Sequence, residues 1–360
     1  MGNLRQAVNL GAFAAGRVRP FAGPAKVTWE VTYRCNMRCN HCHLWQTKEH
    51  DELTTDEAKR FILDAKASGA LHISFSGGEP FLRHDIMELI AYSRDCGLST
   101  AVNTNGSLIT TEERVAAVCN SGLGTAFISL DGADAATHNA VRGNDRAFDL
   151  ALKAIDGLVS ARKGKNPRVF INTTITRGNI DSLEDILSLA KAHGVDGMTM
   201  SILQDIGKYS PDAGAGFAGM KIDQLSNRLR ALADSSDGLI PHTCEYLDNF
   251  RVYVESPNDL YRYRCVAGYA TALIHPNGDV YPCPVAFECM GSLREKSFRE
   301  VWFSEKANEI RSRIKENKHP ICWFDCIAPV SVLLNDVRRL NLSAILDKKI
   351  IAHITKKLAR

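Results

Sequence analysis

The sequence lacks the features that would assign it at once to a membrane or nucleic-acid-binding class. No stretch approaches the roughly 18 consecutive apolar residues that a membrane-spanning helix needs. The 44 basic and 41 acidic residues leave a formal net charge of only +3. That charge is too small to indicate nucleic acid by itself, and neither a nucleic-acid-binding motif nor an internal repeat is present. What remains is an ordinary globular composition, in which 360 residues suffice for one large core and a smaller appended domain.

Acidic residues are absent from the first 26 positions. Arg5, the short apolar stretch 7–15 and then Arg17 and Arg19 give this segment a faint resemblance to a signal peptide. The apolar stretch is short and interrupted by glycine, unlike the apolar core of a typical signal peptide. We therefore expect residues 1–25 to form an amphipathic segment of a cytoplasmic protein.

The cysteines do not form the even set that would suggest a disulfide framework. There are eleven, and eight of them fall into two groups with the spacing of metal ligands, which favours metal binding in a reducing compartment. The first group is Cys35, Cys39 and Cys42, directly after the β-branched run 27–33, which predicts a strand. Three thiolates can hold three irons of a four-iron cluster and leave the fourth iron open to a non-protein ligand. A zinc site is the alternative, although zinc usually takes four ligands in paired spacing.

Strand and helix patterns alternate from residue 27 to about 203, which predicts a parallel sheet of six β/α units. The pattern alone fits a doubly wound sheet and an open barrel equally well. In both arrangements, ligands bind where the strands end. The expected strands are 27–33, 72–76, 99–103, 125–130, 168–176 and 197–202, and the expected helices are 55–68, 85–95, 111–119, 147–161 and 180–193.

Small polar residues follow several of these strands. Gly77 and Gly78 would let the backbone approach a ligand closely, and Glu79 offers a carboxylate beside them. Asn105 follows the third strand and Asp131 the fourth. Ordinary turns use the same residue types, so these residues alone leave a turn or a ligand site open.

Together with the cysteine triad, the sequence Gly77-Gly78-Glu79-Pro80 resembles the GGEP motif of the radical S-adenosylmethionine (SAM) superfamily. The resemblance implies a partial (β/α)6 barrel over residues 26–235, a 4Fe-4S cluster whose open iron is chelated by SAM, and reductive cleavage of SAM to a 5'-deoxyadenosyl radical. It also implies that the GGEP segment binds the amino group of SAM and that Ser129 and Arg142 contact the ribose and the carboxylate. The expected SAM-binding residues are Gly77, Gly78, Glu79, Pro80, Asn105, Ser129, Asp131, Arg142 and Asn172.

A glycine- and alanine-rich linker at 207–221 changes the pattern, and we place a domain boundary near residue 235. Beyond it, Asn277-Gly278 predicts a β-hairpin over 271–281, and a helix is expected from 297 to about 315. These elements would bring together cysteines from distant positions. The second group is Cys265, Cys283, Cys289, Cys322 and Cys326, of which Cys265, Cys283, Cys322 and Cys326 would form a four-thiolate site.

The spacing of this second group resembles the SPASM/Twitch extension of radical SAM enzymes, which here would span residues 236–330 and hold an auxiliary 4Fe-4S cluster. The full SPASM pattern has seven cysteines and two clusters. This chain lacks the C-x2-C pair before its C-x3-C and has no cysteine after Cys326. We therefore expect a single auxiliary cluster, with Cys322 as the preferred fourth ligand and Cys289 as the alternative.

Three other regions carry further predictions. Cys244, beside His242, is a candidate catalytic residue near the cleft, whereas Cys96 and Cys119 lie in helical patterns and are expected in the core. Residues 331–360 predict a basic amphipathic helix. This helix would pack on the barrel or on a partner subunit, or alternatively make peripheral contact with a membrane surface and favour a lipid-linked substrate.

The predicted activity is that of an enzyme that receives an electron from a reductase such as flavodoxin or ferredoxin and abstracts hydrogen from a substrate held over the barrel mouth. The auxiliary cluster would anchor the substrate or accept an electron, which would make the net reaction an oxidation. We see no leader-binding domain, so peptides, small molecules and lipid-linked molecules all stay open as substrates, and no nucleic-acid partner is expected. The alternative is a non-catalytic iron–sulfur electron carrier or a metal-stabilised binding module, neither of which needs a SAM pocket.

Overall fold

A single mixed sheet organises the part of the chain that the computed structural model describes, namely residues 2–48, 51–162, 164, 166–206, 216–217, 222, 224–285 and 288–338. The strand order is β6-β5-β4-β3-β2-β1-β7-β8-β9. Neighbouring strands from β6 to β7 are parallel, whereas β7, β8 and β9 pair in antiparallel fashion. The strands are β1 Lys26–Thr32, β2 His72–Gly77, β3 Ser99–Thr104, β4 Thr125–Ser129, β5 Arg168–Ile175, β6 Gly197–Ile202, β7 Thr271–Ile274, β8 Asp279–Tyr281 and β9 Gly291–Ser292.

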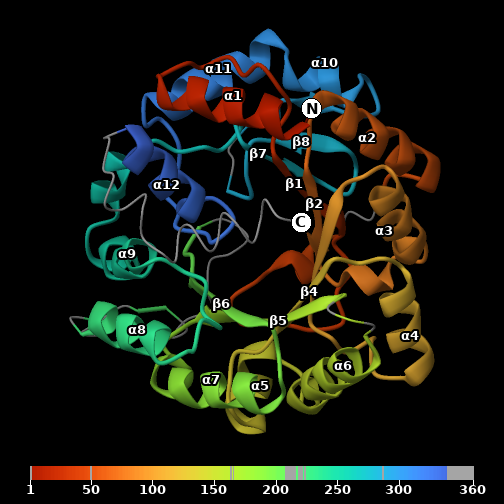
Figure 1. Cartoon of the computed structure of the whole chain (residues 1–360), viewed down its shortest axis with the longest axis vertical. Helices are drawn as coiled ribbons and strands as arrows, with labels where there is room; N and C mark the ends of the chain where they lie inside the picture. The colour runs from red at the N-terminus through yellow and green to blue at the C-terminus, as the bar shows by residue number, and fades with distance from the viewer. Residues whose placement is uncertain are drawn as a thin grey trace.

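Helices surround the curved sheet (Figure 1). The sheet does not close, since β6 and β9 form its two edges, and α9 and α12 lie on the open side, at the left of Figure 1. This is the α/β partial barrel that the sequence predicted. The helices are α1 Gly2–Ala14, α2 Thr55–Ser68, α3 Ile86–Asp95, α4 Glu112–Asn120, α5 Ala135–Arg142, α6 Ala147–Ala161, α7 Leu183–Ala192, α8 Leu225–Asp234, α9 Cys244–Glu255, α10 Phe298–Trp302, α11 Glu305–Lys315 and α12 Ala328–Arg338, with short 3-10 turns at η1 Leu44–Gln46, η2 Pro80–Leu82, η3 Ile180–Ser182 and η5 Pro257–Arg262.

The strands have one apolar face and one more polar face. Residues of β5 alternate between half-buried and buried along the whole strand. Trp29 of β1 is fully buried on the helix side, where its ring lies 5.6 Å from that of Phe61 and 6.0 Å from that of Phe75. On the opposite face Asn103 donates a hydrogen bond to the hydroxyl of Ser74 at 3.0 Å. That polar face is therefore the inner wall of the partial barrel.

The six expected strands and the five expected helices of the barrel are all present, with ends that differ by a few residues, and the expected hairpin is formed by β7 and β8. Two helices, α5 and α9, were missed. Both carry a cap that the sequence analysis overlooked: Asp134 accepts a hydrogen bond from the backbone N–H of Thr137, and Thr243 accepts one from Tyr246. At eight residues, α5 is also too short to show a clear helical period.

The cysteine-rich extension continues the barrel sheet. Strand β7 pairs in parallel with β1 on the side that β2 leaves free, with Lys26 opposite Thr271 and Trp29 opposite Ile274. The boundary near residue 235 therefore stays a proposal about sequence units, since hydrogen bonds cross between the two parts within one sheet.

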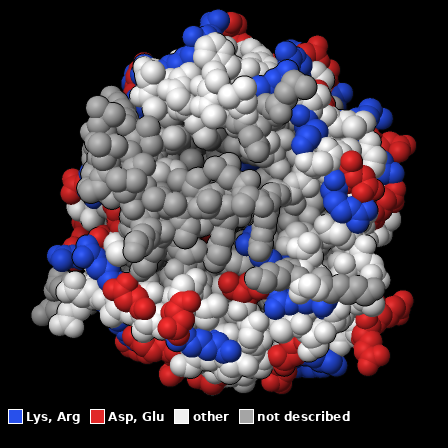
Figure 2. All heavy atoms as spheres, viewed as in Figure 1, with Lys and Arg blue, Asp and Glu red and all other residues white. Residues whose placement is uncertain are grey.

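The two ends of the chain differ in what the structure describes. Residues 2–14 form helix α1, as expected for an amphipathic segment, with Leu4 and Val8 exposed. Of the predicted basic helix over 331–360, the first residues belong to α12, which ends at Arg338, and residues 339–360 lie outside the described residues. None of the helices in the described ranges is long and apolar enough to cross a membrane. Figure 2 shows acidic and basic side chains interspersed around the periphery of one face, so its described residues create no large field of one sign.

Candidate metal centres

The first cysteine group lies on the loop that follows β1. Cys39 is buried, at 8% exposure, and Cys35 and Cys42 are half-buried beside it, all three packed with Met37 and Ala147. Burial is the largest influence on these thiols and raises the pKa of Cys35 to about 12 and the pKa of Cys42 to about 11. The charge of the neighbouring Cys39 also disfavours the charged forms of the Cys35 and Cys42 thiols. The three sulfurs therefore form one coupled group.

Gly77 and Gly78 hold this loop in place. The backbone N–H of Gly78 donates to the carbonyl of Thr32 at 2.8 Å, and the N–H of Glu79 donates to the carbonyl of Arg34 at 2.8 Å. A Cβ atom on Gly77 would lie 2.3 Å from the Thr32 carbonyl oxygen, and one on Gly78 would lie 2.2 Å from the Arg34 carbonyl oxygen. The structure thus explains both glycines by close packing against the cysteine loop, a use that the sequence analysis did not foresee.

Glu79 is enclosed by hydrogen-bond donors. Its side chain is fully buried and accepts hydrogen bonds from the Thr104 hydroxyl at 2.7 Å, the Asn105 N–H at 2.9 Å and the Phe81 N–H at 3.1 Å. Burial raises the pKa of Glu79, and these donors act in the opposite direction. The carboxylate ties the ends of β2 and β3 together, with Pro80 buried at the start of η2. Donors of this chain thus hold the carboxylate in place, and the expectation that Glu79 also binds SAM stays a prediction.

Asn105 joins the end of β3 to the cysteine loop. Its side-chain amide donates to the Asn36 side chain at 2.9 Å, and the Asn36 amide donates to the Ser107 hydroxyl at 2.8 Å. The Ser107 N–H and hydroxyl both donate back to the Asn105 carbonyl oxygen, at 2.9 and 2.6 Å. Asn36 is exposed, so this small network reaches the surface of the loop between Cys35 and Cys39.

Arg142 and Asp131 face each other beside Cys39. Nη2 of Arg142 lies 2.5 Å from Oδ2 of Asp131, and Nη1 lies 3.8 Å from the Sγ of Cys39. Both side chains are nearly inaccessible, with 10% and 0% exposed. Burial lowers the pKa of Arg142, but the charges of Asp131 and Cys39 outweigh it and the net shift is upward. Arg142 therefore stays protonated and points at the cysteine triad.

Ser129 and Asn172 are neighbours across β4 and β5. Both are half-buried, and the hydroxyl of Thr199 on β6 donates to the Asn172 side-chain oxygen at 3.0 Å. The backbone register places all three on the inner face of the sheet. Ser129 and Asn172 are therefore two predicted SAM-binding residues that lie on the inner wall of the barrel, whereas Thr199 was not predicted.

The second cysteine group comes together from distant parts of the chain. Burial, as the largest cause, raises the pKa of Cys265 to about 11 and the pKa of Cys326 to about 12, and it raises the pKa values of Cys283 and Cys322 further. The thiol of Cys322 is also disfavoured in its charged form by the other three. Cys289 lies apart from them, with its Sγ donating to the carbonyl of Gly291 at 3.3 Å.

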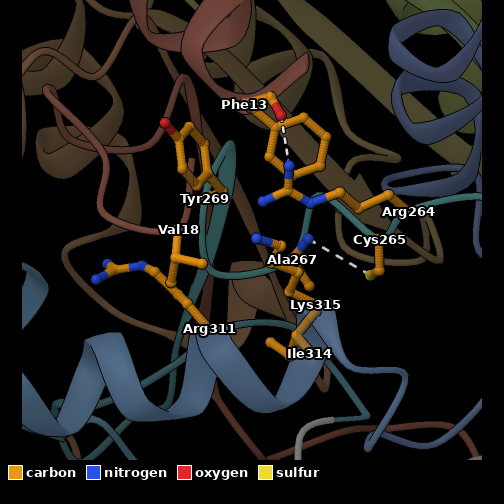
Figure 3. A pocket seen from close by; sticks show the side chains of 9 residues that line it. All are labelled: Phe13, Val18, Arg264, Cys265, Ala267, Tyr269, Arg311, Ile314 and Lys315. Atoms are coloured by element: carbon orange, nitrogen blue, oxygen red, sulfur yellow. Dashed lines mark hydrogen bonds between the residues drawn. The ribbon is translucent and has the colours of Figure 1, made fainter. Parts of the chain in front are cut away.

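The N-terminal segment covers one side of Cys265. Figure 3 shows a small pocket in which the side chains of Cys265, Arg264 and Tyr269 lie next to Phe13 of α1. The Arg264 guanidinium stacks 4.0 Å above the Phe13 ring and donates to the carbonyls of Phe13 at 2.5 Å and Arg17 at 2.7 Å. The Tyr269 hydroxyl is buried there without a hydrogen-bond partner among the described residues. The first helix thus forms part of the wall of the second cysteine group.

Three further cysteines have other surroundings. Cys96 and Cys119 are half-buried and pack against the hydrophobic core, as expected. Cys244 is the first residue of α9 and interacts electrostatically with Arg230 of α8. Its neighbour His242 is occupied, since its Nε2 accepts a hydrogen bond from the N–H of Met200 at 2.8 Å. This places Cys244 between two outer helices, and a catalytic role for it stays a prediction.

Sequence reasoning missed a carboxylate and imidazole pair near the triad. Glu30 of β1 is 2% exposed, and its Oε2 lies 3.6 Å from Nε2 of His275, which follows β7. The His275 ring stacks on Tyr281 with centroids 4.3 Å apart and meets Tyr33 edge-on at 5.8 Å. The available signal was an acidic residue inside an otherwise apolar and β-branched strand.

The donor sets fit four-iron clusters. Among the described residues, no three His, Cys, Asp or Glu side chains surround a point that one metal ion would occupy. A four-iron cluster instead takes one thiolate for each protein-bound iron, so its ligands lie around a larger centre. The triad supplies three thiols and the second group supplies four, all of them soft ligands of the type that iron–sulfur clusters use.

Sequence models of two families match the chain. One is described as the radical SAM superfamily and matches residues 29–202, and the other is described as SPASM, an iron–sulfur cluster-binding domain, and matches residues 265–327. Proteins of these families bind a 4Fe-4S cluster with SAM and auxiliary clusters, which confirms the predicted cofactors at the level of the family.

Named relatives agree with these matches. An AdoMet-dependent heme synthase from Nitratidesulfovibrio vulgaris is 32% identical over 292 residues, which cover 77% of this chain and 78% of that protein. The mycofactocin maturase MftC from Mycolicibacterium smegmatis is 31% identical over 306 residues, which cover 81% and 74%. Among solved structures, Streptococcus suis SuiB bound to its precursor peptide SuiA has a TM-score of 0.64 at 18% identity and covers 93% of this chain and 77% of that one.

Proposed function

The chain belongs to the radical SAM superfamily and carries a SPASM domain, and on that basis we propose that it cleaves SAM reductively and uses the 5'-deoxyadenosyl radical to abstract hydrogen from a substrate, with net oxidation. The observation that carries this proposal is the placement of three thiols on one loop at the end of β1, which the backbone N–H groups of Gly78 and Glu79 hold in place. A non-catalytic electron carrier would have no use for the predicted SAM-binding residues at the ends of the strands.

We assign Cys35, Cys39 and Cys42 as ligands of the first cluster, which supplies the electron for SAM cleavage when it is bound. The protein's own residues bind and orient SAM. The inner-face positions of Ser129 and Asn172 support a role for both residues in binding SAM. Hydrogen bonds of Gly78 and Asn105 hold the cysteine loop beside them. Met37 and Cys39 of the loop are buried, which limits the access of water on that side and protects a radical from side reactions.

We assign Cys265, Cys283, Cys322 and Cys326 to one auxiliary cluster, with Cys289 outside it. Support comes from the mutual electrostatic coupling of the first four thiols and from the separate hydrogen bond of Cys289. In this proposal the auxiliary group anchors the substrate or accepts an electron from it. The first electron comes from a reductase such as flavodoxin or ferredoxin.

Two substrate classes deserve the first tests. Relatives named as heme synthases come from several species, and those matches cover 74–82% of their lengths, which favours a tetrapyrrole. A structural neighbour was solved with its precursor peptide, which makes a peptide the second class. The buried Glu30 and its partner His275 lie where β1 pairs with β7, which supports a substrate held near the junction of the barrel and the extension.

The deciding experiment measures 5'-deoxyadenosine from SAM with anaerobically reconstituted, dithionite-reduced protein. Wild type should form it, Cys39→Ala should not, and Cys119→Ala is the matched control because Cys119 packs on the core away from the triad. Product formation that survives Cys39→Ala, or fails in wild type that holds iron, would overturn the proposal.

A further inference from the structure

We infer that Asp131 positions Arg142 so that its guanidinium donates a hydrogen bond to the sulfur of Cys39, and that this contact makes the cluster on the triad easier to reduce. The inference rests on the proposed function, in which Cys39 is a ligand of that cluster. It adds a contact at the metal centre to the contact with the SAM carboxylate that the family resemblance implies for Arg142.

Arg142 reaches the sulfur because the end of α5 is fixed to the cysteine loop. The N–H of Arg38 donates to the Arg142 carbonyl at 3.2 Å, and the N–H of Asn40 donates to the Val141 carbonyl at 3.0 Å, one bond on each side of Cys39. The next residue, Gly143, ends the helix in a left-handed conformation, and a Cβ there would lie 2.3 Å from the Arg38 carbonyl oxygen. Helix and loop therefore meet at a fixed distance.

Asp131 sets the orientation of the guanidinium. One of its oxygens accepts the Thr174 N–H at 2.8 Å, and its own N–H donates to Nδ1 of His138 at 2.9 Å. Its carbonyl accepts the side-chain amide of Asn179 at 2.9 Å. A carboxylate held in this way by β5 and α5 binds Nη2 of Arg142 through its other oxygen, which leaves Nη1 facing the Cys39 sulfur.

The chemical effect follows from the charge that reduction adds. A hydrogen bond to a cluster sulfur stabilises the more negative, reduced state, and reduction potentials of iron–sulfur clusters depend on such bonds. Asp131 and Arg142 together carry no net charge, so the directed N–H is the main contribution of the pair. Asp131 acts through Arg142 and is a positioning residue.

The test is the midpoint potential of the triad cluster, measured without SAM by redox titration with electron paramagnetic resonance on the reconstituted full-length protein. The signal of this cluster is the one that SAM addition changes. Asp131→Asn combined with Arg142→Gln removes the contact and keeps the net charge of the pair. It should leave about tenfold less cluster reduced at a fixed solution potential, which is about 59 mV for a one-electron couple.

Two single variants separate positioning from charge. Asp131→Asn alone removes a negative charge, which by simple electrostatics would raise the potential, whereas loss of positioning should lower it. Arg142→Lys keeps the charge and one donor and should shift the potential less than the double variant does. Arg142→Lys also carries the test if the double variant does not fold.

The remaining outcomes are distinct. An unchanged potential with weakened SAM binding in the double variant would return Arg142 to the carboxylate of SAM and overturn the inference. Unchanged potential and unchanged SAM binding would leave the pair a packing role and overturn it as well. Iron content that does not fall in Cys39→Ala would instead contradict the proposed function, because no cluster would then sit on the triad.

Discussion

The two cysteine groups of this protein are built in opposite ways. The triad lies on a single loop after β1, and backbone hydrogen bonds from the Gly78 region and from the end of α5 hold that loop. The auxiliary group draws Cys265 from the segment before β7, Cys283 from the segment after β8, and its last two members from the segment between α11 and α12. The ligands of the first centre therefore come from one short segment, whereas those of the second come from segments that only the complete tertiary structure brings together.

The two groups also differ in their charged neighbours. Cys39 faces the guanidinium of Arg142, which favours its thiolate form. Cys322 faces three other thiols that disfavour its charged form, and Lys26 acts on Cys326 in the opposite direction. Thiols must lose their protons to bind iron. Each group thus has a cation that favours one thiolate, and the two groups differ in the repulsion that three other thiols exert on Cys322.

The sharpest way to break this comparison is Cys39→Ala, which should abolish SAM cleavage completely. A cluster with two remaining protein thiolates should be labile, so bound iron should fall from about eight to about four per chain. Iron analysis after anaerobic reconstitution measures this loss. Cys289→Ala is the control and should retain all the iron.

The complementary change is Cys283→Ala with Cys326→Ala. This variant should lose about four irons yet still cleave SAM without substrate, because the triad and its rim lie in the barrel. Substrate turnover should fail. Normal turnover would remove the auxiliary cluster from the mechanism, and outright unfolding, seen by circular dichroism, would show that the cluster is a structural staple.

Gly143→Ala should have a partial effect confined to the triad. A side chain in this left-handed conformation costs about 1–2 kcal/mol, and the added Cβ would also push on the Arg38 carbonyl. Gly238→Ala is the matched control, because Gly238 also has positive φ but nothing lies within 4 Å of its Cβ position. Urea unfolding should show the larger loss in Gly143→Ala, and only this variant should lower SAM cleavage. Equal losses would show that the loop tolerates the shift.

The smallest effect is expected from pH on the cluster-free protein. Burial raises the pKa of Cys35 to about 12, and the pKa values of Cys42 and Cys265 each to about 11, above the ordinary thiol value near 8.5. A raised pKa means that the folded state binds the proton more tightly. This contribution to stability is complete below about pH 8.5 and is lost as the pH rises towards 11 or 12. Between pH 7 and 10.5, the urea midpoint should fall less in the double variant Cys35→Ala, Cys42→Ala than in the wild-type protein. Parallel pH profiles of the two proteins would contradict the expectation.

The sequence predicted the strands and helices of the barrel well because they carry strong local periods, and the family resemblance then favoured a partial barrel over a doubly wound sheet. The triad and the Gly77–Pro80 segment were identified because their residues lie in short contiguous motifs. The hydrogen bonds of Glu79 could not be predicted, because its donors Thr104 and Asn105 lie at the end of the next strand and only the sheet brings them together.

The Asp131 and Arg142 pair could not be predicted as a pair. Each residue was identified separately, but α5, which links them, is short and was missed. The Glu30 and His275 pair depends on β1 lying beside β7, two strands from opposite ends of the chain. Such contacts follow from the strand order, which no local pattern in the sequence specifies.

The pairing of β1 with β7 also bears on how the chain folds as it is synthesised. Strand β1 is the first to emerge, and β2 can pair with it early, but its other edge waits until residues 271–274 have been made. Until then the backbone groups from Lys26 to Trp29 are available to any other extended segment, and unpaired edges of this kind promote association between chains. Slow steps of synthesis before residue 271 are therefore a hazard for this protein, and completion of the extension protects the strand that leads into the cysteine triad.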